Sequence, residues 1–176
     1  MIMTTKIAIA GAKGRMGKNL IRSGLANPHT DVVGIFDISE IGQDFLDEMG
    51  LPNEVANTRE TSFEIADVII DFSFYKTTIE IAQLAVKHKK GLVIGTTGHD
   101  ASSKKQILEV IKGKIPVVWA GNYSIGVNTL NYLTKKAASL LKEKFEAEVL
   151  EMHHHHKKDA PSGTAERLIE ILKHSY

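Results

Sequence analysis

The stretch Lys6-Ile7-Ala8-Ile9-Ala10-Gly11-Ala12-Lys13-Gly14-Arg15-Met16-Gly17 decides the fold. Its first five residues predict a buried strand, and its glycines open a helical pattern that continues to Ala26. The spacing G-x-x-G-x-x-G is a variant of the commoner G-x-G-x-x-G. Such glycines let the backbone turn sharply and approach a pyrophosphate, whose charge is stabilised at the amide-rich start of a helix. A purely structural glycine turn is the alternative, but the position between a strand and a helix favours dinucleotide binding. The residues expected to contact the cofactor here are Gly11, Ala12, Lys13, Gly14, Arg15 and Met16.

Short apolar runs alternate with longer helical patterns through the rest of the first 120 residues. Most of these runs are rich in Val and Ile and lack polar alternation, which is typical of parallel strands covered on both faces. The alternation predicts an α/β fold, a Rossmann-type doubly wound parallel sheet. The expected strands are Lys6–Ala10, Val32–Asp37, Val68–Phe72, Leu92–Gly95 and Pro116–Ala120, and the expected helices are Gly14–Ala26, Lys76–His88 and Ala101–Lys112. The capping-box spacing of Thr61–Glu64 predicts the start of one further short helix.

Asp37 ends the second expected strand, about 20 residues beyond Gly17, where an acidic group accepts hydrogen bonds from the adenosine ribose. A surface aspartate at a strand end is the alternative. An anion at this position disfavours the 2′-phosphate of NADP, and the neighbouring Ile38 offers no cation. Lys13 or Arg15 could reach that phosphate instead. The expected cofactor is therefore NADH, with NADPH tolerated.

Two further loops follow expected strands. Small residues in them permit close approach of the backbone to a nicotinamide, and both loops lie at the carboxyl ends of strands, where ligands bind in open α/β sheets. Ordinary strand-to-helix turns would look similar. The cofactor-binding residues predicted in these loops are Gly95, Thr96, Thr97, Ala120, Gly121, Asn122 and Tyr123.

The pattern changes near residues 122–128. A long helix is expected at Gly126–Lys144, with Leu130, Leu133, Ala137, Leu140 and Leu141 on one side, followed by a strand at Ala147–Met152 and a helix at Gly163–Lys173 with Leu168, Ile169 and Leu172 facing together. We therefore predict a dinucleotide-binding domain at 1–125 and, at 126–176, the N-terminal part of a smaller α+β substrate domain. One strand and two helices offer little surface for a core of their own, so this second part is expected to be incomplete.

Composition narrows the classes of partner and of chemistry. Of the 176 residues, 43% are hydrophobic and 24% are charged, and the net charge of +1 provides no overall attraction to nucleic acid or to an anionic membrane. The absence of cysteine excludes disulfides, thiolate metal sites and cysteine nucleophiles. No apolar run approaches the length that crosses a bilayer, so a cytoplasmic protein is expected.

The run Glu151-Met152-His153-His154-His155-His156-Lys157-Lys158-Asp159-Ala160-Pro161-Ser162-Gly163-Thr164 lies inside the chain, which argues against an expression tag. Together with G-A-K-G-R-M-G, V-I-G-T-T-G and G-N-Y-S-I-G-V-N, it makes the chain resemble the 4-hydroxy-tetrahydrodipicolinate reductase (dihydrodipicolinate reductase) family. The four motifs occur in family order over nearly the whole chain, and the last is far more specific than the glycine motif. Family members usually continue beyond this point with strands that complete the substrate domain and build a tetramer, so the chain is expected to lack that C-terminal part.

The resemblance implies a reaction and a set of residues. Hydride passes from the nicotinamide of NADH or NADPH to C4 of the substrate ring, giving tetrahydrodipicolinate in the diaminopimelate and lysine pathway. A proton donor must neutralise the charge that reaches the ring nitrogen. On the family motif, His153 and Lys157 match the catalytic pair, and His154, Gly163 and Thr164 match the substrate contacts. Free amides at the start of the last helix suit a substrate carboxylate. The expected partners are a small dicarboxylate and, with the C-terminal part, further copies of the chain.

Three alternatives stay open. The chain could hold the nucleotide without turnover, it could be a different Rossmann dehydrogenase because fold alone does not fix the substrate, or the histidines could bind a metal. No carboxylate or cysteine set completes a designed metal site in this run, so no metal is expected. His155 and His156 are not assigned to catalysis.

Overall fold

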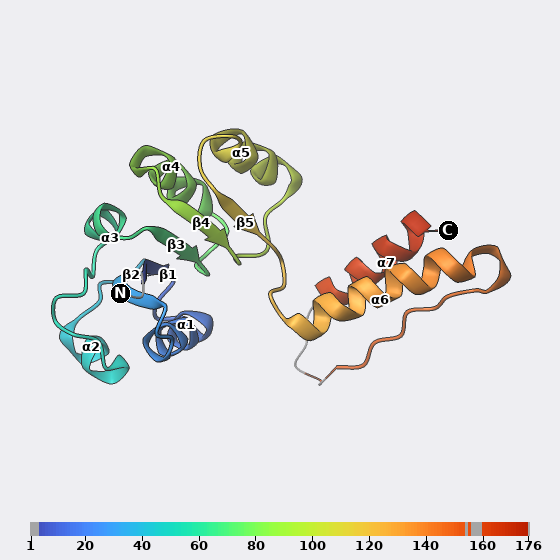
Figure 1. Cartoon of the computed structure of the whole chain (residues 1–176), viewed down its shortest axis with the longest axis horizontal. Helices are drawn as coiled ribbons and strands as arrows, with labels where there is room; N and C mark the ends of the chain where they lie inside the picture. The colour runs from blue at the N-terminus through green and yellow to red at the C-terminus, as the bar shows by residue number, and fades with distance from the viewer. Residues whose placement is uncertain (1–3, 154, 156–159, 176) are drawn as a thin grey trace. The chain divides into compact units, whose positions relative to one another are not determined.

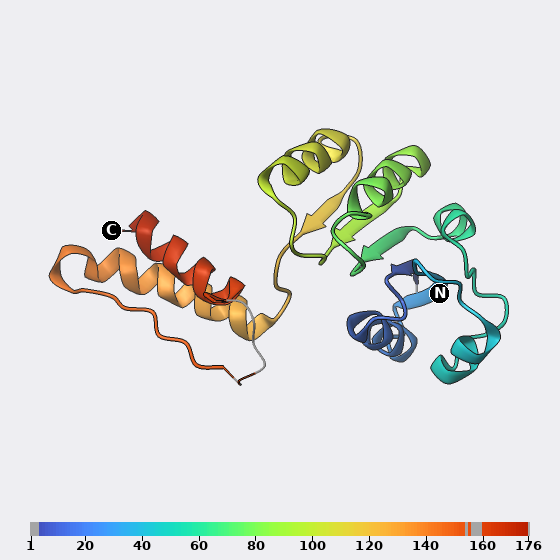
Figure 2. The same ribbon diagram turned by 180° about the vertical axis from the view of Figure 1, so that it is seen from behind.

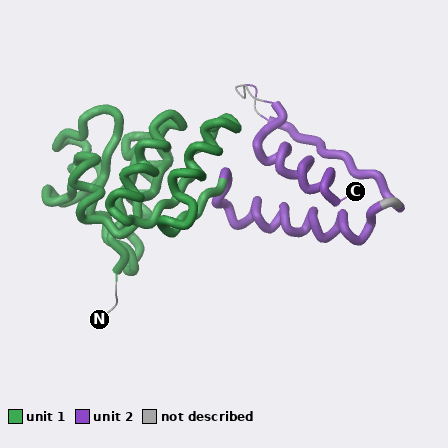
Figure 3. The backbone as a smooth tube through the Cα atoms, turned by 90° about the horizontal axis from the view of Figure 1, so that it is seen from above, with its two compact units in different colours: residues 1–120 green, residues 121–176 purple. Residues whose placement is uncertain are grey.

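The computed structural model describes residues 4–153, 155 and 160–175. These residues form two compact units, 1–120 and 121–176 (Figure 3). His154 and Lys157, to which the family resemblance gives roles, lie outside the described residues. Within the described residues, no helix is long and apolar enough to cross a membrane.

Unit 1 is a five-stranded parallel sheet in the order β2-β1-β3-β4-β5, which confirms the predicted doubly wound α/β fold (Figure 1). Because all the strands are parallel, their carboxyl ends share one edge of the sheet. β1 lies next to both β2 and β3, so the chain changes direction across the sheet at β1, and ligands bind at such a switch point. The strands are β1 (Thr5–Ala10), β2 (Thr30–Phe36), β3 (Val68–Asp71), β4 (Gly91–Ile94) and β5 (Val117–Trp119).

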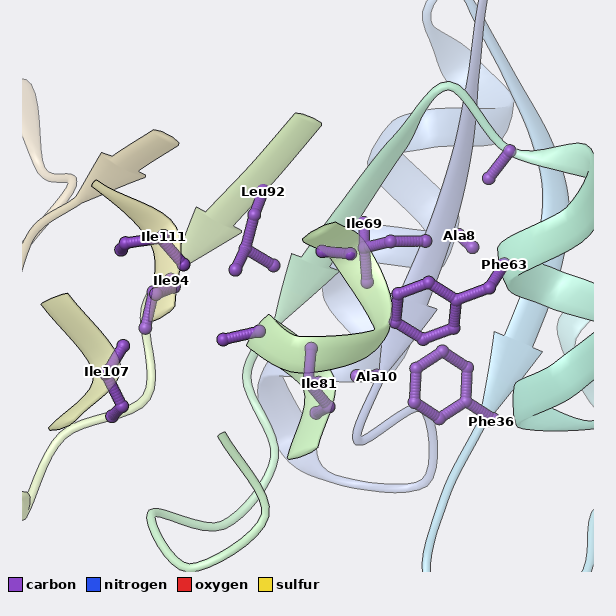
Figure 4. Packing of buried hydrophobic residues seen from close by; sticks show 13 residues of the cluster. Ala8, Ala10, Phe36, Phe63, Ile69, Ile81, Leu92, Ile94, Ile107 and Ile111 are labelled. Atoms are coloured by element: carbon purple, nitrogen blue, oxygen red, sulfur yellow. The ribbon is translucent and has the colours of Figure 1, made fainter. Parts of the chain in front are cut away.

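Alternate residues of β1 point into two separate hydrophobic cores. Ile7 and Ile9 pack on one face, with side chains from α1 and α2. Ala8 and Ala10 pack on the other face, with side chains from α3, α4 and α5, and Figure 4 shows the rings of Phe36 and Phe63 within this second core. The covering helices are α1 (Arg15–Ala26), α2 (Gln43–Met49), α3 (Arg59–Ile65), α4 (Thr78–His88) and α5 (Ala101–Ile111). Figure 2 shows the same arrangement from behind.

Two details of unit 1 differ from the sequence prediction. α2 was not predicted, because a seven-residue helix without a side-chain cap gives almost no signal. The predicted capping box at residues 61–64 is wrong, since these residues lie inside α3. The helix begins earlier, and its cap is Thr58, whose side chain accepts a hydrogen bond from the Thr61 backbone at 3.3 Å.

Unit 2 contains α6 (Ile125–Leu141), a 3₁₀ turn η1 (Lys142–Lys144) and α7 (Gly163–Ser175), and α6 packs against α7. The predicted strand at Ala147–Met152 is wrong, because residues 145–153 have no strand assignment and no described segment pairs with them. A segment of strand-like composition without a neighbour has nothing to share ladder hydrogen bonds with.

The apolar side chains of α6 are largely exposed. Ala138 is the buried residue of this helix, whereas Leu130, Leu133 and Leu140 are 46%, 56% and 82% exposed. Leu141 is 41% exposed and lines a hollow together with Ala138 and with Leu168 and Leu172 of α7, so the predicted apolar side is only partly covered. α7 buries Ala165 and Ile171, and the predicted Leu168 and Ile169 are half-buried beside them.

Candidate functional site

The glycine turn after β1 is tightly packed at its first and last glycines. Gly11 has a φ of +78°, and a Cβ built on it would lie 2.5 Å from the Phe72 carbonyl oxygen. A Cβ on Gly17 would lie 2.1 Å from the Gly11 carbonyl oxygen. Both positions therefore require glycine, one for its backbone conformation and the other for close approach of the helix to the turn. The turn lies directly against the loop that follows β3.

The start of α1 has the features of an anion site. The residue at its N-cap position is Gly14, which has no side chain that could accept a hydrogen bond. The backbone amides of the first turn are therefore not capped by a side chain. Ala12 is fully buried beneath the turn, whereas Arg15 and Met16 are exposed. A helix start of this kind stabilises a phosphate through its amides and its dipole.

Asp37 lies beside the glycine turn, immediately after β2. Its Oδ2 accepts a hydrogen bond from the Lys13 backbone amide at 2.9 Å, and its Oδ1 accepts one from the Ile38 amide at 2.7 Å. A carboxylate has about four acceptor positions, so capacity remains for ribose hydroxyls. The Lys13 ammonium donates to the Glu40 carbonyl oxygen at 2.8 Å and to Ser39 Oγ at 3.2 Å. A cation therefore lies over the segment that follows Asp37, and Ile38 is 80% exposed beside it.

The loop after β4 lies at the same edge of the sheet. Thr96 is buried, and its hydroxyl donates to Asp71 Oδ1 at 2.9 Å. Gly95 faces the Phe72 ring so closely that a Cβ would lie 2.1 Å from it. Thr97 is exposed.

The last predicted cofactor loop is divided between the two units. Ala120 ends unit 1, and its amide donates to the Ile94 carbonyl oxygen at 3.2 Å. Gly121, Asn122 and Tyr123 begin unit 2 ahead of α6. Asn122 Oδ1 accepts from the Ser124 amide at 2.8 Å, which gives this segment a fixed turn.

Sequence reasoning missed Asp71, the last residue of β3. Asp71 is fully buried, and its Oδ1 accepts hydrogen bonds from the Ser73 amide at 3.0 Å, from the Ser73 hydroxyl and from Thr96. An acidic residue that closes an apolar strand, with a serine two residues later, is the signal that could have identified it.

His99 is a second missed polar residue near this edge. It is 7% exposed, its ring stands edge-on to Trp119 at 5.4 Å between centroids, and among the described residues its Nε2 has no hydrogen-bond partner. Burial lowers the pKa of His99, and the Asp71 carboxylate opposes that shift. The imidazole is therefore held in its neutral form more strongly than an exposed histidine.

In unit 2, a carboxylate connects the histidine-rich segment to the start of α7. Glu151 accepts hydrogen bonds from the Ser162 amide at 3.0 Å and pairs with His153 Nε2 at 2.9 Å. The hydrogen bonds from Ser162, followed by that from His153, hold the pKa of Glu151 at about 2. The sequence showed the glutamate, but its link to a residue 11 positions away was not visible in the motif.

The start of α7 is capped by Ser162, whose Oγ accepts from the Ala165 amide at 3.1 Å. Gly163 is exposed and Thr164 is half-buried in the first turn. The structure thus brings His153 and the start of α7 together through Glu151. His154 and Lys157, predicted for substrate contact and catalysis, lie outside the described residues.

Models of one protein family match both units of the chain. The family model described as "Dihydrodipicolinate reductase, N-terminus" matches residues 5–123, and that described as "Dihydrodipicolinate reductase, C-terminus" matches residues 126–176. The 4-hydroxy-tetrahydrodipicolinate reductase of Desulfotalea psychrophila is 40% identical over 175 residues, covering 95% of this chain and 64% of the relative. That of Akkermansia muciniphila is 41% identical over 166 residues, covering 94% of this chain and 60% of the relative. The chain thus spans less than two thirds of the length of these curated relatives.

Solved structures give the same result for the fold. A dipicolinate-bound dihydrodipicolinate reductase from Paenisporosarcina sp. TG-14 superimposes with a TM-score of 0.75 at 28% identity, covering 98% of this chain and 67% of that one. GenD2 from gentamicin A biosynthesis, solved in complex with NAD, reaches a TM-score of 0.60 at 17% identity, covering 76% of this chain and 40% of that one. At that level of identity the second likeness concerns the fold alone.

Proposed function

The chain belongs to the dihydrodipicolinate reductase family, and on that premise we propose that it serves the NADH- or NADPH-dependent reduction of 4-hydroxy-tetrahydrodipicolinate to tetrahydrodipicolinate. This reaction belongs to diaminopimelate and lysine biosynthesis. The observation that carries the proposal is that one chain contains both a fixed glycine turn, in unit 1, and the Glu151–His153–Ser162 cluster, in unit 2. One supplies a dinucleotide site, and the other supplies an oriented imidazole beside a helix start.

The residues of unit 1 fit a nicotinamide dinucleotide. Gly11 and Gly17 allow the backbone to approach a pyrophosphate, the first turn of α1 presents amides to it, and Asp37 retains acceptor positions for a ribose. The loops at Gly95–Thr97 and at Ala120–Tyr123 are proposed to contact the nicotinamide half. A bound nicotinamide supplies the hydride for C4 of the substrate ring.

In unit 2, His153 and Lys157 are proposed to supply the proton that the ring nitrogen needs as hydride arrives. Such a group typically contributes a factor of about 10²–10⁴ in rate. The Glu151 carboxylate, ionised because its pKa is about 2, pairs with His153 Nε2. This contact orients the imidazole and favours a proton on Nε2, so the proton given to the ring nitrogen would leave from Nδ1 of the doubly protonated ring. His154 and the amides of Gly163 and Thr164 are proposed to bind the substrate carboxylates.

Oxidation of NADH by the full chain, with substrate generated by a coupled synthase, tests the reaction. His153→Gln and Lys157→Ala should lower turnover by about 10²-fold or more, while the dissociation constant for NADH stays near that of the unsubstituted chain. His155→Gln is the matched control from the same segment and should keep turnover. Binding of NADH without any oxidation would leave a nucleotide-binding protein, and full turnover in both variants would refute the catalytic assignment.

We propose NADH as the preferred cofactor, because Asp37 repels a 2′-phosphate and Ile38 offers no charge to offset it. Lys13 is the cation best placed to tolerate NADPH, since its ammonium lies at Ser39 and Glu40. Lys13→Met should therefore raise the dissociation constant for NADPH more than that for NADH. Equal or better catalytic efficiency with NADPH in the unsubstituted chain would overturn the preference.

A further inference from the structure

Asp71 joins three segments that meet at the carboxyl edge of the sheet. It closes β3, the strand between β1 and β4. Its backbone carbonyl accepts from the amides of Gly95 at 2.9 Å and Thr96 at 3.1 Å. The next residue, Phe72, packs with its carbonyl against Gly11, as the 2.5 Å approach of a Cβ at that glycine shows. The glycine turn and the loop after β4 are therefore connected through the end of β3.

The two oxygens of the Asp71 carboxyl group differ in their hydrogen bonds. Oδ1 accepts from the Ser73 amide at 3.0 Å, from the Ser73 hydroxyl and from the Thr96 hydroxyl at 2.9 Å. Oδ2 is buried and has no partner among the described residues. A fully buried acidic side chain is costly unless it is hydrogen-bonded. Oδ1 accepts all of these side-chain hydrogen bonds. What the loops need from residue 71 is therefore one acceptor oxygen at the position of Oδ1.

The bonds from Oδ1 reach both neighbouring loops. Ser73 begins the loop that leads to α4, and its hydroxyl lies 3.1 Å from that of Thr77, the residue before the helix. Thr96 lies in the loop after β4 and is 6% exposed, and its hydroxyl donates to Asp71 Oδ1. Without the carboxyl group, the half-buried donors of Ser73 lose this acceptor, and the buried Thr96 hydroxyl keeps only the Asp71 backbone carbonyl, 3.2 Å away. Neither loop then keeps its present conformation at low cost.

We propose that Asp71 is a positioning residue of the cofactor site, which holds the loop after β4 against the nicotinamide half of a dinucleotide. The inference rests on the proposed function for the identity of the ligand. The strand order indicates which half of the dinucleotide Asp71 affects. Asp37 follows β2 on one side of the glycine turn, and Gly95–Thr97 follows β4 on the other. Loss of Asp71 should therefore weaken the nicotinamide half of the site and spare the adenosine half.

Titration calorimetry of the full chain with NADH and with ADP-ribose, which lacks the nicotinamide, tests this. Asp71→Ala should raise the dissociation constant for NADH about tenfold, equivalent to ~1.4 kcal/mol. The constant for ADP-ribose should stay within about twofold, the scatter of a neutral substitution. Asp71→Asn, which keeps an oxygen at the Oδ1 position, should restore NADH affinity. Equal weakening of both ligands by the alanine variant, or an asparagine variant as weak as alanine, would overturn the proposal.

Asp67→Ala is the matched control. Asp67 directly precedes the same strand, and its Oδ2 accepts from the Lys6 amide at 2.9 Å, but it lies at the amino end of the sheet. It should leave both dissociation constants unchanged. Should Asp71→Ala fail to fold, Thr96→Val removes the same hydrogen bond from the other side and should show the same selective loss.

Hydrogen exchange separates this proposal from the proposed function. If the unsubstituted chain binds neither ligand, the proposed function fails, but the amides of 72–77 and 95–98 still report on Asp71. Faster exchange of both segments in Asp71→Ala, with rates in Asp71→Asn like those of the unsubstituted chain, supports the positioning role. Unchanged exchange in the alanine variant refutes it.

Discussion

Gly17→Ala should lower the stability of unit 1, although alanine is the better helix former. Gly17 lies in the first turn of α1, where replacing glycine by alanine gains up to about 1 kcal/mol of helix propensity. The added Cβ, however, would lie 2.1 Å from the Gly11 carbonyl oxygen and 2.7 Å from Ala12 Cα. These are backbone atoms of the glycine turn, so no side chain can rotate away. Overpacking of this kind costs about 1–3 kcal/mol or more, and the net loss should be about 1–2 kcal/mol.

Urea unfolding followed by tryptophan fluorescence measures this loss in unit 1 alone. The chain has one tryptophan, Trp119, which packs against a core of unit 1. A loss of that size should lower the melting temperature of a unit of this length by about 3–12 °C. Affinity for NADH should fall as well, because the same displacement moves the glycine turn.

Gly126→Ala is the matched control for helix propensity. Gly126 also lies in a first helical turn, that of α6, but its nearest neighbouring atom is 3.8 Å from a built Cβ. This variant should keep or raise stability, as measured by circular dichroism. If Gly17→Ala is as stable as the unsubstituted chain or more so, helix propensity outweighs the clash and the close approach of α1 to the turn is refuted.

The other predictions concern caps and ionisable groups. Ser162→Ala should lower the stability of unit 2 by about 1 kcal/mol through loss of a helix cap, measured by circular dichroism; an unchanged midpoint would contradict it. The pKa of Glu151 falls from 4.5 to about 2 on folding, so its carboxylate stabilises above pH 4.5 and this contribution is lost as the pH falls toward 2. Glu151→Gln should flatten acid unfolding in that window, and an unaltered acid profile would argue against the hydrogen bonds from Ser162 and His153. Burial lowers the pKa of His99 below 6.5, so its contribution is present above pH 6.5 and is lost at lower pH. His99→Phe should reduce the stability difference between about pH 8 and about pH 5.5 in urea titrations, and a difference as large as that of the unsubstituted chain would refute this.

The sequence predicted most of unit 1 because its signals are local. Apolar runs such as Val68–Phe72 are too short and too rich in β-branched residues for helices, and glycines mark where the chain leaves the sheet. All five predicted strands are present, with ends shifted by one or two residues. The short α2 was missed because its apolar residues, among them Phe45 and Leu46, span too few turns to show a period.

The errors in unit 2 arise from missing neighbours. Residues 147–152 have a strand-like composition, yet a strand exists only with a partner, and no described segment supplies one. The sequence placed several leucines on one side of α6, and of these Leu141 lies with Ala138 beside α7, whereas Leu133 and Leu140 are more than half exposed. Periodicity shows that a helix has an apolar side, but not which surface will cover it.

The sequence predicted those parts of the candidate site that lie within a single motif. The glycine turn and Asp37 lie where the spacing placed them, and their contact with each other is direct. The roles of Asp71 and Glu151 depend on hydrogen bonds to Thr96 and Ser162, far along the chain, which no local pattern encodes. The assignments to His153, Lys157 and the substrate contacts stay predictions.

The alternation within β1 sets strict limits on changes of chain length. Isoleucines face one helical layer and alanines the other, and the strand ends one residue before Gly11. Inserting or deleting a single residue between positions 6 and 11 would exchange the two faces, forcing branched side chains into the space of methyl groups. The same edit would shift the glycine turn relative to Phe72. Laboratory evolution that permits length variation should therefore leave this segment intact while it remodels the exposed connection around Pro52–Glu54 freely.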